Sequence, residues 1–243
     1  MIFIEIELNG LKLNYEVEGD GKELILLHGW GASLLTFSKL AKSLSNHFKV
    51  YSVDLPGFGS STVGVPLSVE DVADVLHQFI MKLKIGKPIL LGHSYGGRVS
   101  IVYASKYEVE RLILVSSAGI RQKLKFSKRF KIKVYKLLKK CHLPVKMGST
   151  DYQNADNVKR IMLIKAVNTD LRKNMNAINV PTLLIYGKND TVTPLSLGYK
   201  IKENIQNSEL IEMEECGHFP YLDRPSFFMI ILMSFLIGED YAY

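Results

Sequence analysis

Six residues in the first half of the chain, Gly92-His93-Ser94-Tyr95-Gly96-Gly97, restrict the possible fold more than any other segment. They follow the apolar run 88–91 and precede a helix-like stretch at 99–106, so the sequence predicts a strand, a sharp turn and a helix. Glycines at 92 and 96 leave room for a turn in which a Cβ atom would collide. Such a turn lifts the serine between them out of the sheet, which makes Ser94 a candidate nucleophile.

A serine hydroxyl is a weak nucleophile unless a base takes its proton and an acid orients that base. Two downstream segments offer these groups. The apolar strand 182–186 runs into Gly187-Lys188-Asn189-Asp190, and the alternating segment 210–214 runs into Cys216-Gly217-His218-Phe219. Asp190 and His218 are therefore the candidate acid and base, and the order serine, acid, histidine differs from that of the two common serine-protease folds.

Acyl transfer also needs two backbone N–H groups that stabilise the negative charge on the attacked carbonyl oxygen. We expect one from Tyr95, directly after the serine. We expect the other from Trp30 in the loop His28-Gly29-Trp30-Gly31, which follows the apolar run 24–27. His28, Gly29 and Phe219 flank these groups and are candidate residues of the substrate pocket.

These segments together resemble the α/β-hydrolase superfamily, and the resemblance extends from Leu24 to a helix ending near Ile237. By that resemblance Ser94, Asp190 and His218 are nucleophile, acid and base. It implies a mainly parallel eight-stranded sheet with helices on both faces and a helical cap inserted between strands 6 and 7. The motifs that carry it are 28–31, Asp54-Leu55-Pro56-Gly57-Phe58-Gly59-Ser60, 92–97, 187–190 and Gly217-His218-Phe219-Pro220.

Alternation of hydrophobic and polar residues predicts where the strands lie. Asn9-Gly10 separates two runs of period two and is a favoured type I′ hairpin turn. Ser68 and Asp71 resemble a capping box that opens a helix over 69–83. Further strands are predicted at about 24–28, 49–54, 88–93, 111–116, 181–187 and 208–214. We therefore assign 1–118 and 181–243 to the α/β core and 119–180 to the cap.

Charge is distributed unevenly between these two parts. The cap segment has 16 Lys and Arg against 3 Asp and Glu, or +13, whereas the rest of the chain has 15 against 21, or −6, and the two sum to the formal +7. Residues 123–140 are predicted to form a basic amphipathic helix. Its apolar stripe could cover the mouth of the active site, its charge could attract anionic substrates, or it could touch a membrane surface.

Composition is that of a globular enzyme, with 47% hydrophobic and 23% charged residues among 243. The strand-like start has no signal-peptide pattern, which predicts a cytoplasmic protein. Two cysteines, Cys141 and Cys216, indicate no disulfide framework, and no metal-ligand spacing is present, so we expect no metal and no cofactor. No nucleic-acid-binding motif accompanies the positive charge, and no pattern in the sequence predicts an oligomeric state.

The leading hypothesis is a serine hydrolase that cleaves a small carboxylic ester through an acyl-enzyme intermediate, as carboxylesterases do. A second hypothesis is carbon–carbon bond hydrolysis, or elimination as in the menaquinone-pathway lyase of the superfamily. Arg98 gives the S-x-G-G-R pattern of that lyase, although an arginine one turn after the serine could equally pair at the surface. His93 differs from the asparagine usual in the ring-fission hydrolases. A third hypothesis is a ligand receptor with a retained but idle triad.

Overall fold

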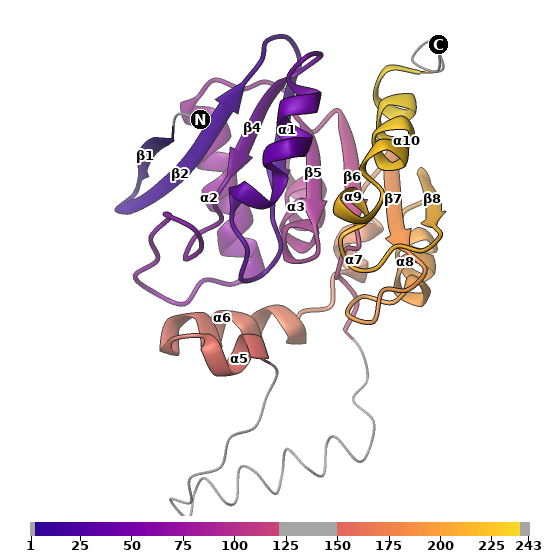
Figure 1. Cartoon of the computed structure of the whole chain (residues 1–243). Coiled ribbons are helices and arrows are strands. Elements are labelled where there is room, and N and C mark those ends of the chain that lie inside the picture. The colour runs from indigo at the N-terminus through magenta and orange to yellow at the C-terminus, as the bar shows by residue number, and fades with distance from the viewer. Residues whose placement is uncertain (1–2, 122–149, 239–243) are drawn as a thin grey trace, which may run out of the picture.

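The structure, a computed structural model, describes residues 3–121 and 150–238. Its centre is an eight-stranded sheet in the order β1-β2-β4-β3-β5-β6-β7-β8. The hairpin β1–β2 runs antiparallel at one edge, β2 pairs antiparallel with β4, and all the other neighbours are parallel. Figure 1 shows this twisted sheet with helices on both faces. The predicted fold class is therefore confirmed.

Most elements lie within one or two residues of their predicted positions. The strands are Ile4–Leu8 (β1), Leu11–Glu18 (β2), Glu23–Leu27 (β3), Lys49–Val53 (β4), Ile89–His93 (β5), Arg111–Val115 (β6), Thr182–Gly187 (β7) and Ser208–Met213 (β8). The helices are the 3-10 helix η1 (Leu34–Phe37) and the α-helices Ser38–Leu44 (α1), Val69–Lys82 (α2), Tyr95–Lys106 (α3), Thr150–Asn154 (α5), Asn157–Asn168 (α6), Arg172–Met175 (α7), Leu195–Lys202 (α8), Pro220–Asp223 (α9) and Pro225–Ile237 (α10).

Local chemistry explains the boundaries that the sequence predicted. Asn9 and Gly10 have φ of 49° and 82°, as a type I′ turn requires. The Ser68 and Asp71 side chains bond each other's backbone N–H groups in a capping box at the start of α2. Helix α3 begins at Tyr95, four residues earlier than the helix-like stretch suggested, because the glycines of the motif lie inside its first turn.

Alternate side chains of the central strands belong to two separate hydrophobic clusters, one on each face of the sheet. Leu24 and Leu26 of β3 pack in the cluster that contains the buried residues of α1 and α10. Ile25 and Leu27 pack in the cluster that contains those of α2, α3 and α8. This alternation is the pattern expected of a strand whose two faces are both covered.

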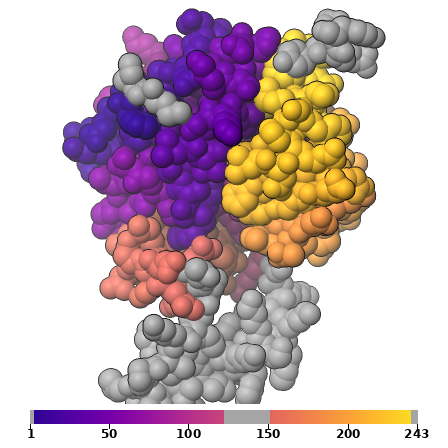
Figure 2. Space-filling view, in the orientation of Figure 1, coloured from indigo at the N-terminus to yellow at the C-terminus, as the bar shows by residue number. Residues whose placement is uncertain are grey.

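The order of the strands determines where a site can form. From β3 the chain moves outward to β4, then returns to the other side of β3 to make β5. The loops that follow β3 and β5 therefore diverge at the carboxyl edge of the sheet, which is where open α/β sheets bind ligands. Helices α5 and α6, which lie between β6 and β7 in sequence, extend beneath this edge (Figures 1 and 2).

Two predictions about the region between β6 and β7 are not decided by this arrangement. The basic amphipathic helix predicted at 123–140 lies outside the described residues. The bounds 119–180 of the cap remain a prediction, although α5, α6 and α7 do lie between β6 and β7. Within the described ranges, no helix combines the length and the apolar character needed to cross a bilayer.

The close approach of β3 to α3 leads to a test of stability. A Cβ atom on Gly96 would lie 2.0 Å from the Leu27 carbonyl oxygen, so Gly96→Ala has to push α3 away from the sheet. We expect this variant to lose about 1–3 kcal/mol in the free energy of unfolding, measured by urea denaturation followed by circular dichroism.

Gly86→Ala is the matched control, since a Cβ atom there meets nothing within 4 Å. It should change stability by no more than about 1 kcal/mol, and in the stabilising direction if at all. Equal urea midpoints for the two variants would show that the approach of β3 to α3 does not limit stability.

Candidate active site

Ser94 occupies the turn between β5 and α3 in a strained backbone conformation, with φ of 52° and ψ of −105°. Its N–H still donates to the Val115 carbonyl of β6 (3.1 Å), while its own carbonyl accepts from the Ala118 N–H (3.2 Å). A Cβ atom on Gly92 would lie 2.4 Å from the Ser100 hydroxyl oxygen. The turn therefore depends on the glycine and on β6, and it leaves Ser94 partly exposed at the carboxyl edge of the sheet.

Asp190 lies in the loop after β7, and its two carboxylate oxygens have different partners. Oδ1 accepts from the backbone N–H groups of Val192 (2.8 Å) and Thr193 (2.9 Å). Oδ2 accepts from the Thr193 hydroxyl (2.7 Å) and faces His218 Nδ1 at 2.8 Å. The first pair of bonds fixes the orientation of the carboxylate, and the second directs it at the imidazole.

His218 lies in the loop after β8, which packs directly against the loop that carries Asp190. A Cβ atom on Gly187 would come within 2.3 Å of the carbonyl oxygens of Cys216 and Gly217, so only glycine permits this contact. The Asn189 N–H donates to the Cys216 carbonyl at 2.9 Å and joins the two loops. The side chain of Asp190 is fully buried in this contact, whereas that of His218 remains 14% exposed.

Hydrogen bonding to Asp190 determines the protonation of both partners. Burial by itself would raise the pKa of the Asp190 carboxyl, but hydrogen bonds from His218 and Thr193 outweigh burial and hold the pKa at about 2. The aspartate is thus ionised at neutral pH and draws the imidazole proton to Nδ1. This tautomer leaves Nε2 of His218 free to accept a proton.

His93, the residue before the serine, packs against His218 and hydrogen-bonds to its backbone. Its ring is buried, and Nε2 donates to the His218 carbonyl at 2.8 Å. Burial, reinforced by the nearby His218, lowers the pKa of His93 to about 3. His93 is therefore a neutral structural donor.

The Ser94 hydroxyl makes no hydrogen bond to His218 in the part of the chain that the structure describes. His93 links the two residues: it directly precedes Ser94 in the sequence, and its ring centroid lies 4.7 Å from that of His218. In sites without substrate, such bonds are often long and tighten only when substrate binds. Transfer of a proton from Ser94 to His218 therefore requires the two side chains to move into contact.

Trp30 and Tyr95, whose backbone amides are predicted to face the substrate oxygen, line the same cavity as Ser94. Neither the Trp30 nor the Tyr95 N–H donates to another described residue, which leaves both available to a ligand. The rings of Trp30 and Tyr95 pack edge to face with centroids 5.1 Å apart. Gly29 is needed beside them, because a Cβ atom there would lie 2.9 Å from His93 Nδ1 and 3.4 Å from Ser94 Cβ.

A cavity of about 1060 Å³ opens at this edge of the sheet. Ser94, Trp30 and Tyr95 line it together with Thr193 and Arg98. Its walls are completed by apolar residues of the first half of the chain, of α6, of the loop after β7 and of α8, and by four charged residues. These are Ala118, Ile120, Leu163, Ala166, Val167, Val192 and Leu197, with Arg121, Asp151, Asp170 and Arg172, and Asn168 also contributes.

The three predicted pocket residues lie outside this wall, each for a visible reason. His28 is fully buried beneath the loop, where Nδ1 donates to the Gly29 carbonyl (2.7 Å) and Nε2 accepts from the Leu55 N–H (3.0 Å). Burial lowers the pKa of His28, which suits this neutral structural role. Gly29 supplies space rather than a contact, and the Phe219 ring packs against His93 at a centroid distance of 4.9 Å.

Thr193 is a residue of this site that the sequence reasoning missed. Its hydroxyl lies 2.7 Å from Asp190 Oδ2, 2.9 Å from the Ser116 carbonyl and 3.1 Å from His218 Nδ1. The signal was present, because a threonine three residues after an aspartate is a common partner in a turn of this kind. Thr193 also lines the cavity, so it connects the Asp190–His218 pair to the space beside Ser94.

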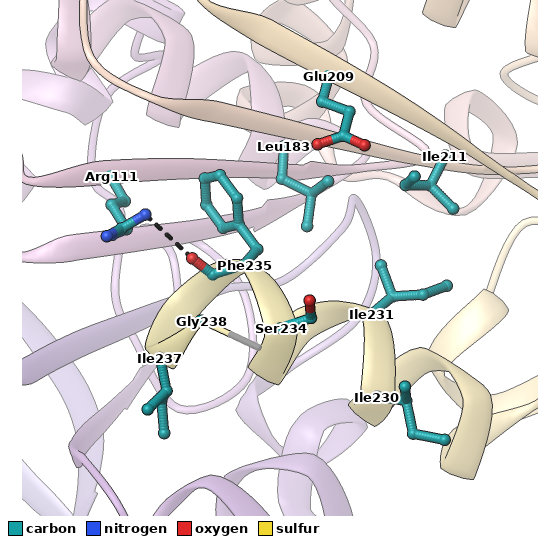
Figure 3. A pocket seen from close by; sticks show the side chains of 10 residues that line it. All are labelled: Arg111, Leu183, Glu209, Ile211, Ile230, Ile231, Ser234, Phe235, Ile237 and Gly238. Atoms are coloured by element: carbon teal, nitrogen blue, oxygen red, sulfur yellow. Dashed lines mark hydrogen bonds between the residues drawn. The ribbon is translucent and has the colours of Figure 1, made fainter. Parts of the chain in front are cut away.

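A second cavity, of about 590 Å³, lies at the opposite edge of the sheet, between α10 and the starts of β6, β7 and β8 (Figure 3). Arg111 donates there to the Phe235 carbonyl at 3.0 Å, and the walls are otherwise largely apolar. None of the predicted site residues lines this cavity. Among the described residues, no three His, Cys, Asp or Glu side chains gather as a metal site would require.

Thr193 provides a test with a defined pH dependence. A carboxyl whose folded-state pKa is depressed stabilises the protein above its unfolded pKa of about 4 and loses this effect as the pH falls towards 2. Thr193→Val removes one hydrogen bond to the charged carboxylate. We expect it to lower the free energy of unfolding at pH 7 by about 1–3 kcal/mol, with a deficit that shrinks below pH 4.

The measurement is urea unfolding from pH 7 down to the lowest pH at which the protein still folds. Thr193→Ser, which keeps the hydroxyl, serves as the control and should stay within about 1 kcal/mol of wild type. A valine variant that matches the serine variant, or a deficit that does not change with pH, would contradict the assigned hydrogen bond.

Known proteins resemble the chain throughout its length. It is 28% identical to a pimeloyl-[acyl-carrier protein] methyl ester esterase of Wigglesworthia glossinidia brevipalpis, over 91% of this chain and 96% of that protein. It is 27% identical to the esterase of the same name from Aliivibrio salmonicida, over 94% and 97%.

Solved structures agree in fold. An esterase from Exiguobacterium antarcticum superposes with a TM-score of 0.79 and 25% identity, covering 96% of this chain and 98% of that one. A bromoperoxidase from Bacillus anthracis superposes with a TM-score of 0.80 at 22% identity, covering 97% and 99%, a likeness in fold alone. The family model described as the alpha/beta hydrolase fold matches residues 23–150 and 146–225. The chain therefore belongs to the α/β hydrolase family.

Proposed function

We propose that this protein is a serine hydrolase that cleaves carboxylic esters, with Ser94 as nucleophile, His218 as base and Asp190 as acid. The observation that carries the proposal is the 2.8 Å contact between Asp190 and His218, beside a cavity lined by a serine in a strained turn. Membership of the α/β hydrolase family and the esterases among its relatives support the same reaction class.

The first half of the reaction forms an ester between substrate and enzyme. His218 Nε2 takes the Ser94 proton as the serine oxygen attacks the carbonyl carbon, and negative charge develops on the carbonyl oxygen. The Trp30 and Tyr95 amides stabilise this charge, each by about 3 kcal/mol. The protonated His218 then gives its proton to the leaving alcohol, while the ionised Asp190 stabilises the imidazolium.

The second half releases the acid. A water molecule takes the place of the alcohol, and His218 accepts one of its protons as the oxygen attacks the acyl-enzyme. Collapse of the tetrahedral intermediate returns the proton to Ser94 and frees the carboxylic acid. Ester and water are consumed, and acid and alcohol are formed, so no cofactor takes part in the balance.

The relatives suggest the kind of ester to test first. They are named for hydrolysis of a methyl ester whose acyl chain is attached to an acyl carrier protein. We therefore extend the proposal to methyl esters of an acyl chain, a small-ester substrate that fits the mixed apolar and charged wall of the cavity. Location in the cytoplasm, the absence of a metal and the role of the basic segment remain predictions from the sequence.

Substitution of the nucleophile tests the mechanism. Ser94→Ala should lower kcat on p-nitrophenyl acyl esters by on the order of 10⁴-fold or more, because no other group can form the acyl-enzyme. A fluorophosphonate probe should label wild type at Ser94, as located by peptide mass spectrometry, and should leave the alanine variant unlabelled.

Ser105→Ala is the matched control, since Ser105 lies on the same helix and its hydroxyl donates to the Val102 carbonyl away from the cavity. It should retain both labelling and hydrolysis. Full hydrolysis by the Ser94 variant would exclude the proposed nucleophile. Wild type that shows no labelling and no burst of p-nitrophenol, yet binds a ligand tightly, would instead favour the receptor hypothesis.

A further inference from the structure

Arg98 is a buried cation in the wall of the catalytic cavity. It lies on α3, one helical turn after Ser94, and only 7% of it is exposed. Both residues line the same cavity. An arginine with this burial is uncommon unless it has a charged partner.

Within the described residues, no carboxylate pairs with Arg98. Its one hydrogen bond among the described residues runs from Nη1 to the Thr169 carbonyl, at the end of α6, over 3.1 Å. Within the described residues no Asp or Glu oxygen lies within 4.0 Å of it, and residues 122–149 contain no Asp or Glu that could supply one. Asp170, the nearby acid, instead holds Arg172 through two bonds of 2.9 and 2.8 Å.

The rest of the guanidinium group opens onto the cavity. A guanidinium has five N–H donors, and among the described residues only Nη1 of Arg98 has a protein acceptor. The other nitrogens are not among the buried polar atoms that lack a partner, so they reach open space, which the cavity provides. Burial lowers the pKa of Arg98 to about 10, and the group is therefore still positively charged at neutral pH.

We propose that Arg98 binds a carboxylate of the substrate, so that the preferred ester is the half-ester of a dicarboxylic acid. A guanidinium with unused, parallel N–H donors matches the two oxygens of a carboxylate. The inference rests on the proposed esterase function and adds to it the chemical class of the acyl group.

The geometry limits the distance between ester and carboxylate. Four residues of helix separate Ser94 from Arg98, which is about 6 Å along the axis of α3. Leu163 and Val167 of α6 contribute apolar wall to the same cavity and suit a short methylene chain between the two polar ends. Water hydrolyses such a half-ester to a dicarboxylate and an alcohol, by the steps given above for any ester.

The test compares matched pairs of substrates. Monomethyl esters of straight-chain dicarboxylic acids of about four to eight carbons span about one helical turn and are compared with methyl esters of monocarboxylic acids of equal length. We expect wild type to show a higher kcat/KM for the half-esters. In Arg98→Met the ratio of the two kcat/KM values should fall by about 10- to 100-fold, because a charge-assisted pair is lost.

Two further variants make the ratio interpretable. Lys173→Met removes the same charge from an exposed residue of α7 that does not line the cavity, and it should keep the wild-type ratio. Arg98→Lys keeps the charge but not the paired donors, so its ratio should fall by less than that of the methionine variant. If circular dichroism shows that Arg98→Met does not fold, the lysine variant replaces it in the comparison.

The outcomes separate this inference from the proposed function. Wild type that hydrolyses both ester series without preference, or Arg98 variants that lose activity on both series equally, would overturn the carboxylate site while the esterase stands. If wild type hydrolyses neither series, the proposed function fails. In that case the carboxylate site is tested by calorimetric titration with adipate. The site stands if adipate binds wild type and its affinity is at least about 10-fold weaker in the Arg98 variants.

Discussion

The turn at Ser94 is the constraint on which the rest of the site depends. Within one residue the chain changes from a strand that pairs with β6 to the first turn of α3, and Ser94 takes a φ of 52° to make the change. Such a conformation costs about 1–3 kcal/mol and persists only where its surroundings enforce it. Here the sheet enforces it, because Gly96 of the turn packs directly against the Leu27 carbonyl of β3. The serine is therefore positioned by the core of the protein rather than by a loop.

The two histidines near this turn, His93 and His218, differ in burial and therefore in the role that each imidazole can take. His93 is sealed in the core, stays neutral and serves as a hydrogen-bond donor to the loop of His218. His218 remains partly exposed and faces an ionised aspartate, so it can gain a proton without leaving a buried charge uncompensated. Because burial keeps His93 neutral near pH 7, His93 would not compete with His218 for the Ser94 proton in the proposed reaction.

Residues at strand ends could be predicted from the sequence, because parallel strands bring their carboxyl ends to one edge. Ser94, Asp190 and His218 each follow such a strand, and the structure brings Asp190 and His218 into contact. Ser94 lines a cavity together with Thr193, the hydrogen-bond partner of Asp190. Contacts between separate elements could not be predicted in this way. The burial of Arg98 depends on the end of α6, some seventy residues away, and a helical pattern alone equally allows a surface position. Nor does periodicity reveal that the described structure has no hydrogen bond between the Ser94 and His218 side chains.

Stability alone does not account for the surroundings of Arg98. Asp170 follows Thr169, the acceptor of Arg98, and would be the obvious partner for a buried guanidinium, yet it binds Arg172 and accepts from the backbone N–H groups of Arg121 and Arg172. These bonds hold the pKa of Asp170 at about 2, with the hydrogen bonds from the Arg172 side chain as the largest cause. Burial of a charge without a charged partner costs free energy, so the position of Arg98 beside Ser94 is more easily explained by a ligand. Among the described residues, Arg98 thus has no carboxylate partner in the cavity that Ser94 also lines, which is the space that the proposed substrate carboxylate would fill.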